Sequence, residues 1–341
     1  MNVYPLTFRP LFKERVWGGR RIAELFGRSL PEDVPIGESW ELSDRAEGVS
    51  VIANGPWAGR DLRWLMDQHG EAVLGRPVDS GERFPWLIKI LDARDDLSLQ
   101  VHPPPHRAGE LRGEPKTELW YFAATRPGAR IYAGLNPGVS RQEFEQRIRD
   151  GSVAGCFHVE SPRAGDAMFV PSGRVHALGA GNVVFEIQQN SDTTYRVFDW
   201  NRPGLDGRPR ELHIGPSLES VDFSDVAPGL VQAPWVSRNG ASRRALARHD
   251  VFRIDEWRFD GATKTTDGRQ PGECAVILVA GGRLRCLHPL DAPELGPGDS
   301  VLIAAALPAL ALEAAPGTTL LHVTPSESRP NGSRAAASAL P

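Results

Sequence analysis

The sequence predicts an all-β protein, built as a sandwich or a barrel. Short apolar runs recur along the chain, and turns separate them; the 341 residues include 35 Gly and 29 Pro. Runs of this length that are rich in β-branched and aromatic residues and bounded by such turns are typical of strands. Examples are residues 85–91, 118–124, 182–189 and 275–282.

Three short helices are expected among these strands. Each has apolar residues at helical spacing and a glycine close behind: 22–26 before Gly27, 62–66 before Gly70, and 140–150 before Gly151. The third has the strongest signal, because Ser140 and Glu143 make a capping box at its start. It lies between β-like segments, so it is expected to be an insertion beside a sheet.

A segment rich in Pro, Asn and Gly at 233–241 predicts a boundary between two β-domains. Residues 1–235 would form the first, with short helical insertions, and 236–325 the second, whereas the small polar residues of 326–341 predict a disordered tail. A weak repeat supports this division, since 164–170 and 297–303 each open an apolar strand with a Gly-Asp turn. His176 follows the first copy and no histidine follows the second, so the second domain is expected to be metal-free.

Composition excludes several classes of partner. The net charge is −4 and the pI about 6.2, with both signs interspersed, which argues against binding to nucleic acid or to a membrane surface. The longest apolar stretch, 301–312, is too short for a membrane helix. Three cysteines without metal-finger spacing suit buried residues in a reducing compartment, so a cytoplasmic protein is expected.

Polar side chains recur on one face of several apolar strands. Successive strand residues point to opposite faces. One such face alone would usually face solvent, but the repetition indicates a barrel with a polar interior. The residues concerned are Ser98, Gln100 and His102; Lys116, Glu118 and Trp120; Glu186 and Gln188; and the lone charge Lys89.

One segment matches a conserved motif of a known superfamily. Gly165 is followed after five residues by Pro171-Ser-Gly173 and then by His176. This resembles the second motif of the cupins, whose histidine is a metal ligand, although the asparagine that usually follows is out of register. The resemblance implies two cupin-like jelly-roll β-barrels, with a metal in the first.

The first cupin motif departs from the usual pattern in an informative way. It reads Gln100-Val-His102, and the glutamate, Glu118, lies 16 residues beyond His102 as part of Lys116-Thr-Glu118. This resembles the type I mannose-6-phosphate isomerases, or phosphomannose isomerases, in their short bacterial branch. The resemblance runs through most of residues 4–202 and includes the segments 16–19, 37–41, 48–54, 170–177 and 186–196.

The resemblance implies a metal site and its ligands. The family's zinc ligands fall on Gln100, His102, Glu118 and His176, which predicts one Zn²⁺ per chain. Zinc accepts imidazole and carboxylate ligands, and a neutral amide in place of an anionic ligand leaves the ion more acidic. Two histidines and one carboxylate also suit iron, manganese or cobalt, so the residues alone leave the metal open.

The resemblance also implies roles for charged residues. Arg196 corresponds to the family's active-site arginine. Lys116 is expected to be the general base through a lowered pKa, and Glu186 is a rival base or orients Arg196. Ser98, Lys89 and Arg202 match positions near the substrate or its phosphate, although Arg202 could equally be a solvated loop arginine.

The implied activity is the interconversion of D-mannose 6-phosphate and D-fructose 6-phosphate through a metal-assisted cis-enediol, by proton transfer between C2 and C1. Which group opens the sugar ring is left open, because Pro115 and Leu178 stand where some relatives carry histidine and tyrosine. A cupin oxygenase, a non-catalytic sugar-phosphate-binding cupin and an isomerase of another sugar phosphate remain alternatives. The cluster of basic residues favours an anionic substrate. A monomer and a homodimer are both compatible with the sequence.

Overall fold

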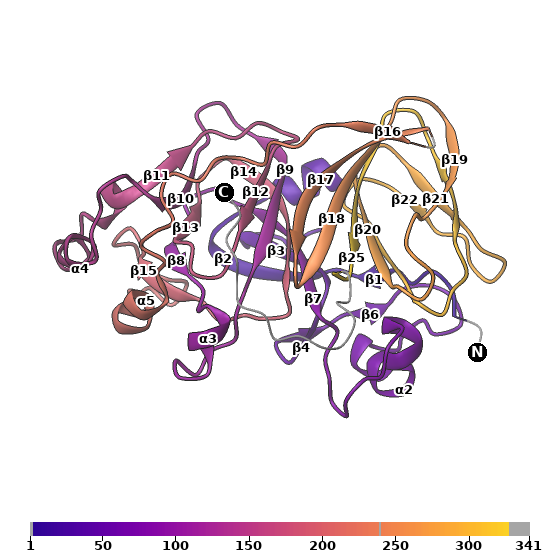
Figure 1. The fold of residues 1–341 in the computed structure, drawn as a ribbon, viewed down its shortest axis with the longest axis horizontal. Coiled ribbons are helices and arrows are strands. Elements are labelled where there is room, and N and C mark those ends of the chain that lie inside the picture. The colour runs from indigo at the N-terminus through magenta and orange to yellow at the C-terminus, as the bar shows by residue number, and fades with distance from the viewer. Residues whose placement is uncertain (1–2, 239, 327–341) are drawn as a thin grey trace.

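The computed structural model describes residues 3–238 and 240–326, and it confirms a mainly β protein with two β-barrels. The barrels stand side by side in Figure 1, the first coloured indigo to rose and the second orange to yellow. Each consists of a six-stranded sheet and a smaller facing sheet. The predicted tail, 326–341, lies outside the described residues except for Ser326.

The first barrel pairs a six-stranded with a five-stranded antiparallel sheet. The larger sheet has the order β12 (Ala167–Val170), β9 (Glu118–Thr125), β14 (Asn182–Gln189), β7 (Trp86–Asp92), β3 (Ile36–Leu42) and β2 (Leu11–Gly19). The smaller has the order β11 (Phe157–Glu160), β10 (Ile131–Leu135), β13 (His176–Leu178), β8 (Leu99–Val101) and β15 (Tyr195–Phe198). Two short ribbons flank it: β1 (Phe8–Arg9) with β6 (Val51–Ile52), and β4 (Asp44–Arg45) with β5 (Gly48–Val49).

The second barrel repeats this order, except that its smaller sheet has no counterpart of β15. Its larger sheet runs β23 (Ser300–Ile303), β20 (Ala275–Gly281), β25 (Thr318–Thr324), β18 (Phe252–Phe259), β17 (Ala241–His249) and β16 (Val236–Arg238). Its smaller sheet runs β22 (Glu294–Leu295), β21 (Leu284–Leu287), β24 (Ala311–Ala314) and β19 (Thr263–Thr266). The repeated Gly-Asp turns precede β12 and β23, which are the matching edge strands of the two larger sheets.

The helices are short and lie outside the sheets. They are α1 (Arg21–Phe26), α2 (Leu62–Leu74), α3 (Pro105–Ala108), α4 (Arg141–Asp150), the 3₁₀ turn η1 (Val153–Cys156) and α5 (Ile214–Ser220). The predicted starts and stops of α1 and α4 are confirmed, with Gly27 and Gly151 both left-handed. Within residues 3–238 and 240–326, none of the helices has the length and apolarity needed to cross a membrane.

The predicted end of the second helix is wrong. Helix α2 continues past Gly70, bends at His69, and ends at Leu74 before the left-handed Gly75. The reason is tertiary packing, because Val73 and Leu74 are buried in the hydrophobic core and the carbonyl of Val73 accepts a hydrogen bond from Ala305 in the second barrel. Burial of apolar side chains outweighs the modest cost of a glycine inside a helix.

Strand alternation places the polar residues inside the first barrel. On β7, Ile88 and Ile90 face the shared core, whereas Lys89 faces the barrel interior. On β14, Phe185 and Ile187 face the shared core and Glu186 the interior. The larger sheet is therefore apolar on its outer face and partly polar on its inner face, as the period-2 pattern predicted.

One hydrophobic core joins the two barrels. It runs from the outer face of β7, β9 and β14 into the larger sheet of the second barrel. The N-terminal segment also crosses over, since Leu6 exchanges two backbone hydrogen bonds with Leu302 of β23, at 2.9 and 2.8 Å. The division of the chain at 235/236 into two domains stays a prediction, and the shared core shows that the two barrels are packed as one body.

A partly buried group of charged side chains also lies at this junction. The guanidinium of Arg28 lies 3.1 Å from the carboxylate of Glu41 and 3.0 Å from that of Asp299, and it donates to the carbonyl of Gly298 in the second barrel. Burial raises the pKa of Glu41 to about 7, although Arg28 and a hydrogen bond from Ser39 oppose this. The Glu41 carboxyl therefore titrates near neutral pH in the folded protein.

We expect Glu41 to make stability fall as pH rises from 5 to 8. Because the folded-state pKa of about 7 exceeds the ordinary 4.5, the folded chain holds this proton longer than the unfolded chain. The raised pKa of Glu41 contributes up to about 3 kcal/mol to the free energy of unfolding. This contribution is present below pH 4.5 and is lost as the pH rises through 7. Denaturant unfolding at pH 5 and pH 8 should show a smaller difference for Glu41→Gln than for the wild type. Glu71→Gln, at an exposed position, is the control and should behave as the wild type.

Candidate metal centre and substrate cavity

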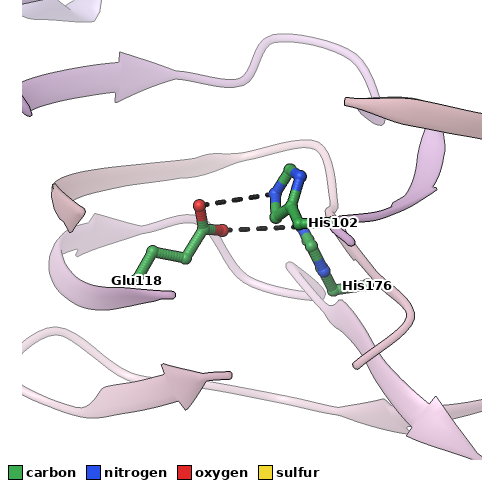
Figure 2. A group of neighbouring side chains, drawn as sticks. All are labelled: His102, Glu118 and His176. Atoms are coloured by element: carbon green, nitrogen blue, oxygen red, sulfur yellow. Dashed lines mark ion pairs between the residues drawn. The ribbon is translucent and has the colours of Figure 1, made fainter. Parts of the chain in front are cut away.

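Both sheets of the first barrel contribute to a cluster of candidate ligands. His176 opens β13, and the β13–β8 register sets it directly opposite Gln100. His102 follows the end of β8, and Glu118 opens β9 in the facing sheet. Figure 2 shows the Glu118 carboxylate facing both imidazole rings. The strands thus bring together residues that lie up to 76 positions apart in the chain.

The cluster is tight and fully buried. The Glu118 oxygens lie 3.5 Å from Nε2 of His102 and 3.5 Å from Nε2 of His176. The donor atoms of the three residues all lie within 4.8 Å of one another. Among the described residues, neither Glu118 oxygen nor Nε2 of His102 has a hydrogen-bond partner, although Lys116 Nζ lies 3.1 Å from Oε2. Buried polar atoms left without partners are costly, which indicates that another group completes this site.

Both histidines are oriented as metal ligands usually are. Nδ1 of His102 lies 2.8 Å from the carbonyl of Thr193, and Nδ1 of His176 lies 2.9 Å from that of Arg174. A carbonyl only accepts, so each Nδ1 carries the hydrogen and each Nε2 presents a lone pair toward Glu118. Burial lowers the pKa of His102 to about 3 and also lowers that of His176. Both rings are therefore neutral and able to bind a cation at physiological pH.

Gln100 lies beside the cluster. Its side-chain amide is 3.2 Å from Nε2 of His176. Rotating the amide by half a turn exchanges nitrogen and oxygen at this position, and the two are assigned from their surroundings rather than seen. The oxygen of Gln100 can therefore face the same point as the His176 lone pair. The four predicted ligands lie together, and their donor set of two imidazoles, a carboxylate and an amide oxygen fits a divalent metal ion.

A cavity of about 580 Å³ opens above this cluster. Gln100 and Lys116 lie on its floor, and the buried His102, Glu118 and His176 lie beneath them. Ser98, Lys89 and Glu186 also line it, and the ammonium of Lys89 is 3.2 Å from Oε2 of Glu186. Six of the predicted site residues therefore share one cavity: Lys89, Ser98, Gln100, Lys116, Glu186 and Arg196.

The expected lowering of the Lys116 pKa is not produced by the protein residues themselves. Burial lowers the pKa of this ammonium, but the nearby carboxylates of Glu118 and Glu186 outweigh burial and raise it. Lys116 is held as a cation by its ion pair with Glu118, 3.1 Å away. A bound cation that neutralised Glu118 would remove the largest of the attractions that raise the pKa of Lys116.

Arginines gather at another part of the cavity wall. Arg196 on β15 and Arg210 in the following loop both line it. Nε and Nη2 of Arg210 bind the two carboxylate oxygens of Asp199, at 2.6 and 2.5 Å. Nε of Arg196 is buried and has no hydrogen-bond partner among the described residues. Asp199 thus meets two guanidinium groups, because Arg202 also lies 3.0 Å from it.

Arg202 does not lie on the cavity wall. Its guanidinium lies 3.0 Å from the carboxylate of Asp199, and the cavity lining includes Arg210 rather than Arg202. The chain reverses in the loop 203–210, where Pro203 and Pro209 form an antiparallel bridge, and this brings Arg210 to the cavity. Family resemblance made Arg202 a candidate, and only the loop conformation reveals Arg210.

Two further charged residues of the cavity lining, Glu38 and Arg15, were not predicted from the sequence. Glu38 on β3 lines the cavity and accepts hydrogen bonds from Trp40 Nε1 and Arg15 Nε, both at 2.7 Å. Burial raises the pKa of Glu38, but Lys89 and Arg15 outweigh burial and lower it to about 2. Glu38 could have been found from the sequence, because it belongs to the segment 37–41 that carries the family resemblance. No pattern in the sequence marked Arg15.

The comparisons with known proteins agree with this geometry. The model of the phosphomannose isomerase type I catalytic domain matches residues 6–133. The mannose-6-phosphate isomerase of Streptococcus mutans is 35% identical over 300 residues, which span 88% of this chain and 92% of that protein. Mannose-6-phosphate isomerase ManA of Bacillus subtilis is 35% identical over 289 residues, or 83% of this chain and 88% of that protein. The chain belongs to the type I phosphomannose isomerase family.

Solved phosphomannose isomerases share the fold of both barrels. The mannose 6-phosphate isomerase structure from Bacillus subtilis superposes with a TM-score of 0.84 and 32% identity, over 94% of this chain and 99% of that chain. A zinc-bound mannose 6-phosphate isomerase matches with a TM-score of 0.73 and 17% identity, over 95% of this chain and 100% of that chain. The family resemblance and the cupin architecture predicted from the sequence are thereby confirmed.

Proposed function

We propose that this chain interconverts D-mannose 6-phosphate and D-fructose 6-phosphate, with a zinc ion held by Gln100, His102, Glu118 and His176. The observation that carries this proposal is a buried cluster of metal-ligating side chains with unpartnered atoms beside a cavity whose lining includes Lys116, Arg196 and Arg210. The relatives named mannose-6-phosphate isomerase support mannose 6-phosphate as a substrate. A bound divalent metal would supply a Lewis acid for charge that develops on the substrate oxygens during proton transfer.

The charge distribution in the cavity gives the substrate one orientation. Arg196 and Arg210, with Asp199 behind them, form the wall that suits a phosphate dianion. Lys116 and Glu186 lie on the floor near the metal ligands, where the reacting C1 and C2 of the sugar would be placed. Ser98 and Lys89 also line the cavity and are further donors. Arg196 on β15 is the register partner of Gln100 on β8, so this wall adjoins the proposed metal ligands.

Two residues are candidates for moving the proton between C2 and C1. Lys116 is buried beside Glu118, and Glu186 is buried beside Lys89. Burial raises the pKa of Glu186, with Lys89 opposing, which makes this carboxylate a stronger proton acceptor. Trp120 Nε1 donates to Glu186 at 3.1 Å and fixes this carboxyl on the floor of the cavity. We propose Lys116 as the base and Glu186 as the alternative base. Substitution of each residue in turn distinguishes the two.

Conversion of mannose 6-phosphate measured in a coupled assay, together with elemental analysis of the purified protein, tests the proposal. We expect turnover and close to one zinc per chain. Chelation should remove activity, and added Zn²⁺ should restore it. A metal-loaded chain that binds mannose 6-phosphate without turnover would instead indicate a binding protein, and consumption of oxygen would indicate an oxygenase.

We expect the two arginines that share Asp199 to differ in their effect on substrate binding. Arg210→Met should raise KM for mannose 6-phosphate by about ten- to a hundredfold with little change in kcat, since a charge-assisted pair contributes about 1.5–3 kcal/mol to both ground and transition states. Arg202→Met is the matched control, because it removes the other guanidinium bound to Asp199 and should leave KM within about threefold. Unphosphorylated mannose should not distinguish the variants. An unchanged KM in Arg210→Met would place the phosphate elsewhere.

A further inference from the structure

The second barrel contacts the strand of the first barrel that carries Glu118. In Figure 1, β9 and β12 of the first barrel lie beside β17 and β18 of the second. Along β9, Trp120 faces the interior of the first barrel, where its Nε1 donates to Glu186 at 3.1 Å. Tyr121 is next in the strand and faces the core that the two barrels share. One side of β9 therefore holds groups of the proposed active site, and the other side meets the second barrel.

Glu256 of β18 binds Tyr121 across the junction between the barrels. The Tyr121 hydroxyl donates to Oε1 of Glu256 at 3.0 Å, and both side chains are buried. Burial, together with the charge of Glu256, raises the pKa of Tyr121, so the hydroxyl keeps its hydrogen at physiological pH. A hydrogen bond to a charged acceptor is stronger than one between neutral groups. The second barrel therefore has a firm polar contact with β9.

Two arginines of the second barrel hold Glu256 in place. Arg244 lies directly opposite Glu256 on β17 and is 2.6 Å from its Oε2, and Nε of Arg258 donates to Oε1 at 2.8 Å. Arg244 also donates to the carbonyl of Gly165, in the turn before β12. That turn is itself bonded to β9, because the amide of Gly165 donates to the carbonyl of Phe122 at 2.8 Å. The charged group around Glu256 therefore contacts both β9 and the turn that leads into its neighbour β12.

The β9–β14 ladder connects this contact with the proposed active site. Tyr121 is the register partner of Phe185, and their rings stack with centroids 6.4 Å apart. The adjacent rung of the ladder pairs Trp120 with Glu186. Protein interiors are closely packed and transmit small displacements from one residue to the next. A shift of Tyr121 would therefore move the part of β9 that carries Trp120 and, three residues before Tyr121, the proposed metal ligand Glu118.

We propose that Glu256 is a positioning residue for the first barrel. Through Tyr121 it fixes β9, and it thereby sets the Glu118 carboxylate for zinc binding and the Trp120–Glu186 pair for proton transfer. The second barrel thus takes part in the reaction, although none of its described residues lines the substrate cavity. This inference rests on the proposed zinc site. Groups that orient metal ligands without touching the metal typically contribute about ten- to a hundredfold to metal affinity.

Zinc affinity of the full chain, measured by competition with a chromophoric chelator, tests the proposal together with steady-state kinetics at saturating zinc. Tyr121→Phe removes only the hydroxyl, and Glu256→Gln removes the charge that the two arginines hold. We expect each variant to bind zinc about tenfold more weakly and to have a lower kcat. KM for mannose 6-phosphate should stay within about threefold, because Arg210 is unchanged. The double variant should be no weaker than the weaker single variant, since both changes break one connection.

Asp267→Asn is the matched control for a role in stability alone. Asp267 is also fully buried in the second barrel and is paired with an arginine. Its side-chain partners, Arg269 and the amide of Leu310, both belong to the second barrel. Like Glu256→Gln, this change leaves a buried arginine without its carboxylate and should lower the melting temperature. Unlike Glu256→Gln, it should leave zinc affinity and kcat at the wild-type values.

Two results would overturn the proposal. One is wild-type zinc affinity and kcat in both Tyr121→Phe and Glu256→Gln. The other is an equal loss of zinc affinity in Asp267→Asn, which would show that the variants act through stability alone. Zinc affinity is measured without turnover, so a chain that binds zinc but does not isomerise mannose 6-phosphate still tests this role. Failure of the proposed function would appear in the wild type, whereas failure of this inference would appear only in the variants.

Discussion

His176→Ala is expected to lose the bound metal and more than a thousandfold of kcat, while the chain keeps its fold. Removing one ligand from a site with few ligands sharply weakens metal binding. Loss of the metal then removes most of the stabilisation of charge that develops on the substrate. His102→Ala should behave in the same way, because its Nε2 also faces Glu118. Elemental analysis and steady-state kinetics measure both effects.

His106→Ala is the matched control, since this exposed histidine of α3 lies outside the cluster and the cavity lining. It should retain full zinc content and full turnover. Far-ultraviolet circular dichroism should be the same for all three variants. Stoichiometric zinc retained by both His176→Ala and His102→Ala would show that the metal is bound elsewhere.

The second large effect is expected from Lys116→Met, which should reduce kcat by about 10²- to 10⁴-fold, the usual contribution of a general base. If Lys116 removes the C2 proton, exchange of deuterium from C2-labelled mannose 6-phosphate into water should fall together with turnover. Lys116→Arg restores the positive charge beside Glu118 without a titratable base, so it should not restore exchange.

Glu186→Gln is the matched comparison on the neighbouring strand β14. It keeps the hydrogen-bonding shape of the side chain and its contact with Trp120 but removes the carboxylate. We expect a loss of about tenfold in kcat, from the weakened positioning of Lys89. If exchange is abolished in Glu186→Gln and persists in Lys116→Met, the base is Glu186. Zinc content must be measured in every variant, because Lys116 contacts a metal ligand.

Most of the site was accessible from the sequence because it depends on local patterns. The alternation of a strand assigns Ser98, Gln100 and His102 to one face whatever the rest of the fold does. Turn motifs locate His176, and family resemblance connects it with Glu118. The strand order of the two barrels was less accessible, since pairing between strands far apart in sequence is decided by packing.

The errors arose where tertiary contacts overrule local signals. Gly70 looked like the end of α2, but contact with the second barrel carries the helix on to Leu74. The role of Arg202, suggested by family resemblance, stays a prediction, but a reversing loop brings Arg210 rather than Arg202 to the cavity lining. The electrostatic state of Lys116 depends on two carboxylates from different strands, and no local pattern predicts that sum.

The core shared by the two barrels has a consequence for synthesis on the ribosome. The outer face of β7, β9 and β14 is apolar, and the strands that cover it, β17 to β25, are made last. At about 5–20 residues per second, the finished first barrel would expose this face for several seconds while residues 241–324 emerge. Leu6, near the start of the chain, also cannot form its two backbone hydrogen bonds until Leu302 has been synthesised. The nascent chain is therefore most open to aggregation, and most dependent on chaperones, after its catalytic half is complete.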